Sequence, residues 1–145
     1  MRHYLDDDEV FLANYADAVT DLDLASYIDN FLQHDKTACF LSVPAPYTFH
    51  IVHADDDGNV TSLEHVGNSK VRINAGFFVL RREIFDVMNP DEELVIEPFA
   101  RLIDQGKLMA VAYDGFWQNM DTFKDKMRLD EIAASGHPPW QLWAH

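Results

Sequence analysis

Two aspartates stand where a carboxylate could hold a divalent cation. Asp17 follows the apolar run 10–15 and is flanked by small alanines that leave room for a ligand. Asp121 ends the stretch 114–121, which follows another apolar run. Mg²⁺ usually takes one or two protein carboxylates and completes its shell with water and substrate phosphates. If the fold joins these two strand ends, Asp17 and Asp121 form a magnesium site; otherwise each is a turn or cap residue.

Three further residues could contact a ligand beside such a site. Asn74 and Gly76 interrupt a predicted strand, and glycine in a strand marks either close approach by a ligand or a bulge. Trp117 could stack on a ligand through its ring. For Trp140 and Trp143 we favour a structural role, in which the C-terminal segment docks onto the core or onto a partner subunit.

The segment 53–64 suggests a different chemistry, because it almost matches a calcium-binding EF-hand loop. Asp55, Asp57 and Glu64 fit three ligand positions, but His53 stands where the loop requires its first aspartate. The flanking residues also predict strands rather than helices. We therefore favour a hairpin turn here and keep a calcium-binding module as an alternative.

The elements that must position these residues predict a mixed α/β fold. Continuous apolar runs at 10–15 and 37–43 are typical of strands buried on both faces, as in parallel sheets. Between them, apolar residues at helical spacing predict a helix over 24–32, so that strand, helix and strand form a βαβ unit. The later segments predict a hairpin over 49–66, a strand over 72–80, short helices over 81–88 and 97–106, a strand over 108–113 and a helix over 122–134.

Composition limits the class of protein. The 145 residues suit one domain, and 11 Lys and Arg against 25 Asp and Glu give a net charge of −14. Nucleic acids and anionic membranes need the opposite sign, so neither is an expected partner. The lone Cys39 excludes an internal disulfide and suits a buried thiol. The N-terminus does not look like a signal peptide, and no apolar run reaches about 18 residues; we expect a cytoplasmic protein.

Four segments, in this order, resemble motifs of the sugar-phosphate nucleotidyltransferases. FLANYADAVTDL at 11–22 is similar to the family's YGDGVxD motif, and INAGFFV at 73–79 is similar to INGGFFV. The segment 97–110 is similar to the family's EP…L…GxLxAY stretch, and DGFWQNMDT at 114–122 is similar to DGFWQxMDT. The fourth segment and the PPWQLW ending at 138–143 are most similar to the glucose-1-phosphate cytidylyltransferase branch.

The resemblance implies a fold, a reaction and a site. The fold would be Rossmann-like α/β with a mixed sheet and a β-hairpin insertion, truncated at the N-terminus. The reaction would join a nucleoside triphosphate, CTP in that branch, to glucose 1-phosphate and release pyrophosphate with Mg²⁺. The resemblance implies that Asp17 and Asp121 are catalytic and bind the metal. The residues it implies as substrate-binding are Asn74, Gly76, Glu97 and Trp117.

The resemblance also predicts what these 145 residues do not contain. The family's glycine-rich GGxGTRL loop and its PKP segment, which grip the nucleotide, have no counterpart here. We interpret residues 1–145 as a single domain, the C-terminal sugar-binding part of the fold, and expect it to be inactive without an N-terminal half. The alternative is a non-catalytic remnant that binds a sugar phosphate or assembles with a relative. A sheet without its N-terminal strands should have unpaired edges and apolar surface, so we expect self-association by edge pairing or through Trp140 and Trp143, giving a homo-oligomer.

Overall fold

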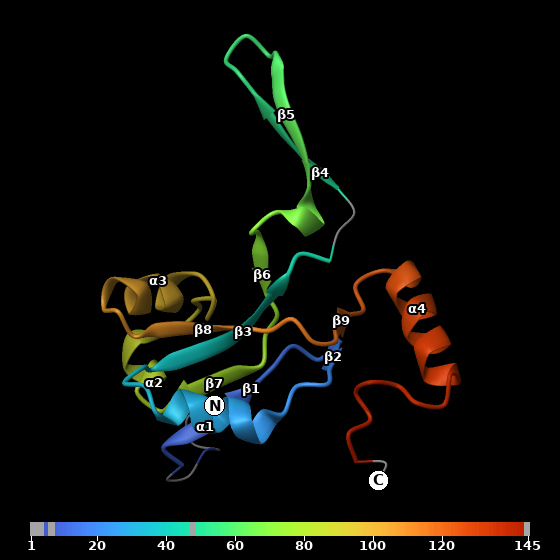
Figure 1. Cartoon of the computed structure of the whole chain (residues 1–145). Coiled ribbons are helices and arrows are strands. Elements are labelled where there is room, and N and C mark those ends of the chain that lie inside the picture. Colours follow the sequence, from blue (N-terminus) through green and yellow to red (C-terminus); the bar gives the residue numbers. More distant parts are fainter. Residues whose placement is uncertain (1–4, 6–7, 47–48, 144–145) are drawn as a thin grey trace.

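A five-stranded mixed sheet forms the body of the computed structural model, which describes residues 5, 8–46 and 49–143 (Figure 1). The strand order is β1-β7-β3-β6, with β8 paired to β3. β8 is parallel to β3, and every other pairing in this sheet is antiparallel. The strands are β1 (Val10–Ala13), β3 (Ala38–Pro44), β6 (Arg72–Asn74), β7 (Phe78–Arg81) and β8 (Leu108–Ala112).

The first predicted strand is present, but its predicted pairing and burial are wrong. β1 pairs antiparallel with β7 and lies at an edge of the sheet, where Leu12 remains 52% exposed. The run 10–15 is largely apolar because its side chains contact hydrophobic residues on both faces of the sheet. A parallel strand on each side of β1 is not the reason. Because β1 and β3 are both antiparallel to β7, they run in the same direction, as the predicted βαβ unit requires, with β7 between them.

Helices cover both faces of this sheet. α1 (Leu24–Leu32) begins at Asp23, whose carboxylate accepts the first free backbone N–H groups, and it buries Tyr27 and Phe31 on one face. α2 (Ile84–Val87) and α3 (Glu97–Asp104) pack on the other face. Cys39 lies buried on the α1 side, where burial raises the pKa of its thiol, as expected for an inert core cysteine.

The predicted strand over 72–80 is divided in two. β6 ends at Asn74 and β7 begins at Phe78, with Gly76 at φ +76° and Phe77 at φ +51° between them. A Cβ added at Gly76 would lie 2.5 Å from Oδ1 of Asn14. Glycine is therefore required at position 76 both by the backbone conformation and by the close side chain.

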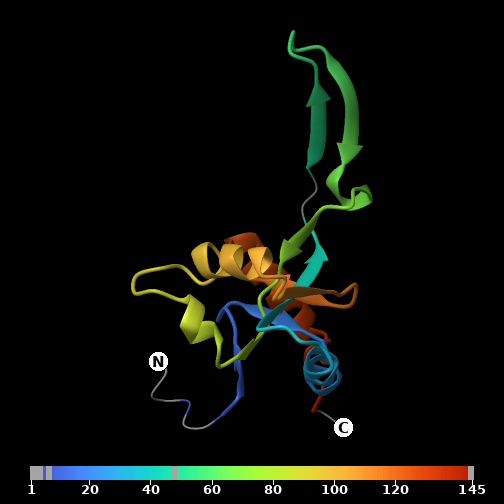
Figure 2. The same cartoon turned by 90° about the vertical axis from the view of Figure 1, so that its left-hand side faces the viewer.

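Two segments extend from the body (Figures 1 and 2). The predicted hairpin is present as β4 (His50–Ala54) and β5 (Val60–His65), which pair with each other and precede the short 3₁₀ turn η2 (Val66–Asn68). The predicted C-terminal helix is α4 (Phe123–Ala134), which begins with the capping box of Thr122 and Asp125, as expected. None of its twelve residues is buried. Trp140 lies 5.7 Å, ring to ring, from Phe116, whereas Trp143 is 75% exposed.

A second small sheet was not predicted. β2 (Ala18–Thr20) pairs antiparallel with β9 (Trp117–Asn119), although the sequence predicts no strand in either segment. Three-residue strands are too short for the alternation of polar and apolar residues to indicate them. Across the described part of the chain, no helix combines the length and the apolar character needed to cross a membrane.

Candidate functional site

The small sheet of β2 and β9 brings the two predicted metal ligands to the same end. Ala18 pairs with Asn119, and the backbone N–H of Met120 donates to the carbonyl of Asp17 at 2.9 Å. Asp17 therefore lies immediately before β2, and Asp121 lies two residues after the end of β9, the strand that pairs with β2. The antiparallel pairing joins two motifs that lie at opposite ends of the sequence.

A pocket of about 260 Å³ opens at this end of the small sheet. Four of the six predicted site residues line it, and they come from three separate segments of the chain. β6 contributes Asn74, and β9 contributes Trp117. The full lining is Tyr15, Asp17, Ala18, Ile73, Asn74, Trp117, Asn119 and Asp121.

Hydrogen bonds hold several of these side chains in position. The indole N–H of Trp117 donates to the carbonyl of Ala75 at 3.1 Å. Oδ1 of Asn74 accepts the backbone N–H of Gly76 at 2.9 Å. Nδ2 of Asn119 donates to Oδ2 of Asp121. The pocket is therefore lined by polar groups whose orientation is set before a ligand arrives.

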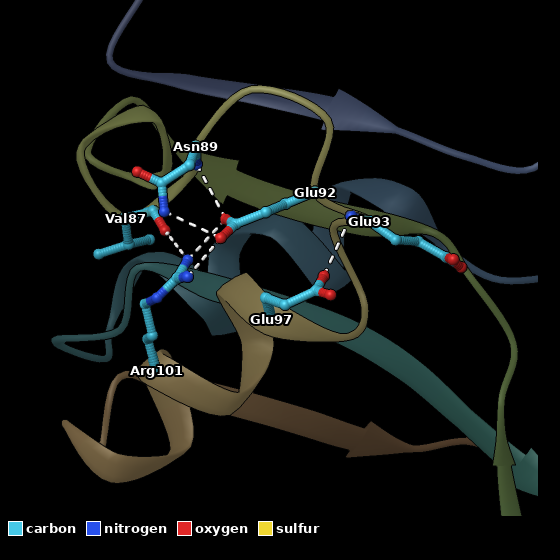
Figure 3. Close-up of polar contacts among 6 residues, drawn as sticks. All are labelled: Val87, Asn89, Glu92, Glu93, Glu97 and Arg101. Atoms are coloured by element: carbon cyan, nitrogen blue, oxygen red, sulfur yellow. Dashed lines mark hydrogen bonds and ion pairs between the residues drawn. The ribbon is translucent and has the colours of Figure 1, made fainter.

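The other two predicted residues do not line the pocket. Gly76 is buried, and its positive φ allows the turn in which its backbone N–H donates to Asn74. Glu97 lies in the first turn of α3, where its Oε2 accepts the backbone N–H of Glu93 at 3.2 Å (Figure 3).

The loop before α3 is fixed by a charged cluster (Figure 3). Both guanidinium nitrogens of Arg101 donate to the Glu92 carboxylate, and one also donates to the carbonyl of Val87 at 2.7 Å. Asn89 donates to the same carboxylate through its backbone N–H at 2.9 Å and its side chain at 2.8 Å. Hydrogen bonds from Arg101 and then from Asn89 lower the pKa of Glu92 to about 2. This cluster holds the segment that carries Glu93.

Tyr15 is a pocket residue that sequence reasoning missed. It lines the pocket beside Asp17 and is 45% exposed. Burial raises the pKa of Tyr15, the charges of Glu93 and Asp17 act in the same direction, and a side-chain hydrogen bond with Asn74 opposes them. The signal available in the sequence was its position two residues before Asp17, at the end of the apolar run. Asn119 was also missed, although it lies two residues before Asp121.

The pocket is electrostatically negative. Asp17 and Asp121 line it, and none of the described residues in its lining is Lys or Arg. Arg72 lies on β6, two residues from Asn74, but its guanidinium bonds Asp114 at 2.9 Å as well as Ser42 and Tyr113. It acts as a structural tie between strands, so an anionic ligand in the pocket needs positive charge from elsewhere.

The carboxylate and amide side chains of the pocket suit Mg²⁺ better than they suit a metal that is bound entirely by protein ligands. Within the described residues, no group of three or more His, Cys, Asp and Glu side chains comes together as a metal cage. Two carboxylates, Asp17 and Asp121, share the pocket with the amides of Asn74 and Asn119. Mg²⁺ keeps several waters and binds through one or two carboxylates together with substrate phosphates, so this set fits it.

Comparisons with known proteins support the resemblance found in the sequence. No family model matches the chain. It is 38% identical over 145 residues to the glucose-1-phosphate cytidylyltransferases of Salmonella typhi and Salmonella typhimurium. It is 27% identical over 138 residues to a protein of Bacillus subtilis named as a probable enzyme of the same kind. These matches cover 94–99% of this chain but only 54–56% of the relatives, so the chain spans about half their length.

Two solved structures share the fold of this chain. A Bacillus anthracis crystal structure named for a glucose-1-phosphate thymidylyltransferase has a TM-score of 0.65 at 13% identity, covering 91% of this chain and 57% of that one. HddC from Yersinia pseudotuberculosis has a TM-score of 0.62 at 18% identity and covers 86% and 56%. The predicted fold class, α/β with a mixed sheet of the nucleotidyltransferase type, is confirmed. The chain is similar to glucose-1-phosphate cytidylyltransferases over about half their length.

Proposed function

We propose that this chain forms the sugar-phosphate side of a nucleotidyltransferase that joins CTP to glucose 1-phosphate and releases pyrophosphate. The observation that carries the proposal is the convergence of Asp17, Asn74, Trp117 and Asp121 on one pocket. These residues come from three of the four segments that resemble the family. Their types suit a sugar phosphate held beside a magnesium ion.

The uncharged residues of the pocket would bind the sugar. The ring of Trp117, fixed by its hydrogen bond to Ala75, offers an apolar face of the kind on which a sugar ring stacks. The amides of Asn74 and Asn119 and the hydroxyl of Tyr15 offer donors and acceptors for sugar hydroxyls. Because Asn74 is anchored to Gly76, little rotamer freedom is lost when the sugar binds.

Asp17 and Asp121 would hold Mg²⁺, as the notable acidity of the pocket suggests. Bound there, the ion would neutralise phosphate charge and draw electron density from the phosphorus that is attacked. Without a cation, the two carboxylates would repel the substrate phosphates. The role of the chain is therefore to orient the sugar phosphate, because phosphoryl-type transfer depends mainly on positioning and charge stabilisation.

The proposal includes a second part that grips the triphosphate. Relatives of this chain are nearly twice as long as the segment that it matches. None of the described residues that line the pocket is Lys or Arg. Positively charged groups outside the pocket must therefore balance the negative charge of the triphosphate. We expect the chain to act in the cytoplasm and to self-associate, with the exposed Trp143 as one candidate contact.

The alternatives are less well supported. In the segment that resembles a calcium loop, Asp55 accepts the backbone N–H groups of Asp57 and Asn59, so its carboxylate closes the hairpin turn. A non-catalytic remnant that binds the sugar phosphate would share the same pocket. This remnant would differ from the enzyme of the main proposal only in showing no activity when the second part is present.

The test is a pyrophosphate-release assay with CTP, glucose 1-phosphate and Mg²⁺. The chain is co-expressed with the portion of the Salmonella typhi relative that has no counterpart in it. We expect activity from the pair, a loss of at least about 100-fold in Asp17→Asn and Asp121→Asn, and little change in Asp29→Asn, an exposed aspartate on α1. Sugar-phosphate binding without any pyrophosphate release would favour the non-catalytic remnant and contradict the proposal.

A further inference from the structure

The two strands of the small sheet are far apart in the sequence. β2 and β9 have three residues each, and Thr20 and Phe116, which lie at the same end of the pair, are 96 positions apart. In a hairpin the turn decides which residues pair, but here four strands of the main sheet lie between β2 and β9 in the chain. A slip of one residue would turn every side chain of one strand to the opposite face. Asp17 and Asp121 would then no longer share a pocket.

One carboxylate joins the two strands at the end away from the pocket. Oδ1 of Asp21, the residue after β2, accepts the backbone N–H of Phe116 at 2.8 Å and also the hydroxyl of Tyr113. The backbone N–H of Asp21 donates to the carbonyl of Phe116 at 3.2 Å. Oγ1 of Thr20 donates to the same carbonyl at 2.8 Å. These hydrogen bonds tie Phe116 to the end of β2 and so determine which residues of β2 and β9 pair.

Tyr113 connects this end of the small sheet to the main sheet. It follows β8, and its backbone N–H donates to the carbonyl of Ser42 on β3 at 2.9 Å. Its ring packs against the core beside α1 and against Gly115, where an added Cβ would overlap the ring. Burial and then the hydrogen bond to Asp21 raise the pKa of Tyr113 to about 12. The hydroxyl therefore stays protonated at neutral pH and donates to the carboxylate.

Asp21 and Tyr113 act at a distance from the pocket. Neither is among the described residues that line it. Asp21 and Asp17 lie at opposite ends of β2, about 13 Å apart at about 3.3 Å per residue. The side chains of the small sheet that line the pocket lie on alternate positions of the strands, namely Ala18, Trp117 and Asn119. A change at Asp21 therefore reaches the pocket chiefly through the pairing of the strands.

We propose that Asp21 and Tyr113 are positioning residues that fix the register of β2 against β9 and thereby hold Asp17 and Asp121 together for a divalent cation. This inference rests on the proposed function, because it names what keeps the two carboxylates of that site in place. A carboxylate suits the role, since an ionised acceptor forms shorter and stronger hydrogen bonds than a neutral one. A two-stranded sheet this short is only marginally stable by itself, so losing these bonds should let the strands separate more often.

The test uses variants of the 145-residue chain that remove these bonds in steps. Tyr113→Phe removes only the hydroxyl, and Asp21→Ala removes the acceptor of both side-chain bonds. Asp21→Asn keeps an amide oxygen that can accept both, so it should restore most of the parent behaviour. Asp23→Ala is the matched control, because it removes the same charge two residues away together with the two backbone bonds that begin α1. Thermal melting of each variant checks that the chain folds.

The first readout is amide hydrogen exchange of Met120, whose N–H bonds the carbonyl of Asp17 at the pocket end of the small sheet. We expect exchange at least about tenfold faster in Asp21→Ala and about fivefold faster in Tyr113→Phe. It should change by less than about threefold in Asp21→Asn and in Asp23→Ala. Exchange in both test variants at the rate of Asp23→Ala would overturn the inference.

The second readout is a titration of each variant with Mn²⁺, a paramagnetic ion that takes the same carboxylate ligands as Mg²⁺. Broadening of the indole N–H signal of Trp117 reports the ion in the pocket. The Mn²⁺ concentration for half-maximal broadening should rise at least about fivefold in Asp21→Ala and Tyr113→Phe, and less than about twofold in Asp23→Ala.

The outcomes of the Mn²⁺ titration separate this inference from the proposed function. If the parent chain binds Mn²⁺ and both folded test variants bind it equally well, the inference is overturned and the proposed function stands. Faster exchange of Met120 with unchanged Mn²⁺ binding would overturn it as well, because the register would then not control the site. A parent chain whose Trp117 signal does not respond to Mn²⁺ would instead overturn the proposed function, and with it the cation-holding role of Asp21 and Tyr113.

Discussion

At the scale of residues, the charged cluster around Glu92 gives the fold a defined dependence on pH. Arg101 and Asn89 lower the pKa of Glu92 from 4.5 to about 2. A carboxyl whose pKa is lower in the folded state stabilises the fold above its unfolded pKa, and that contribution is lost as the pH falls through the folded value. The cluster therefore stabilises the loop before α3 fully at neutral pH and progressively less between about pH 4.5 and 2.

We expect Glu92→Gln to lower the melting temperature by several degrees at pH 7. The difference from the parent chain should shrink as the pH is lowered from about 4.5 to 2, since the carboxyl of the unfolded chain is then protonated while that of the folded chain is still ionised. Calorimetry at a series of pH values measures both. Glu131→Gln, at an exposed site on α4, is the control. A difference that stays constant down to pH 3 would mean that the ionised carboxylate is not what stabilises the loop.

Some of the residues that line the pocket could be predicted from the sequence, and others could not. Asp17, Asn74, Trp117 and Asp121 were predicted because each interrupts or ends an apolar run or belongs to a family-like motif, and the structure places all four in one pocket. Tyr15 was missed because it reads as the last apolar residue of a strand. That Glu97 contacts Glu93 and does not line the pocket depends on the path of the loop before α3, which no local pattern encodes.

At the scale of elements, the break between β6 and β7 shapes the pocket. Gly76→Ala must adopt a positive φ and place its Cβ against the side chains of Asn14 and Tyr15. We expect it to destabilise the chain by about 2–4 kcal/mol in urea unfolding.

Gly58→Ala is the matched control for that change, because Gly58 has a φ of +83° with nothing within 4 Å of an added Cβ. It should cost only about 1 kcal/mol, the cost of the left-handed conformation alone. Equal effects of the two substitutions would contradict the close packing that surrounds Gly76.

The helix α4 should open independently of the body, because none of its residues is buried. Thr122→Ala removes the capping box and should destabilise the helix by about 1 kcal/mol. Amide hydrogen exchange within α4 should then accelerate roughly fivefold, while exchange in β3 stays unchanged. Arg128→Ala, on the exposed surface of α4, is the control. An equal acceleration in β3 would show that α4 and the sheet unfold together.

Most elements were predictable, and the exceptions share one cause. α1, α3, α4 and the hairpin of β4 and β5 follow from apolar spacing, caps and turn residues that lie within each segment. The pairing of β1 with β7, and of β2 with β9, joins segments more than sixty residues apart. Such pairings are decided by packing across the whole fold, so the local sequence predicted neither the antiparallel neighbour of β1 nor the small sheet that carries the pocket.

At the scale of the whole molecule, the net charge and the share of the relatives that the chain spans support the same proposal. The chain carries a net charge of −14, its pocket contains two carboxylates, and within its described residues the edge strand β1 pairs only with β7. Its relatives are nearly twice as long as the region that it matches. The proposed function, in which this acidic chain binds the sugar phosphate and a second part supplies cations for the nucleotide, accounts for all four observations.

The most direct test of this account is a titration of the isotopically labelled chain with glucose 1-phosphate in excess Mg²⁺, followed by the indole N–H signals of its three tryptophans. Trp→Phe variants assign the signals. We predict that the Trp117 signal shifts with saturation, that the exposed Trp143 signal does not, and that Asp17→Asn or omission of Mg²⁺ abolishes the shift. A Trp117 signal that stays in place at saturating glucose 1-phosphate and Mg²⁺ would contradict the central claim that this pocket binds a sugar phosphate.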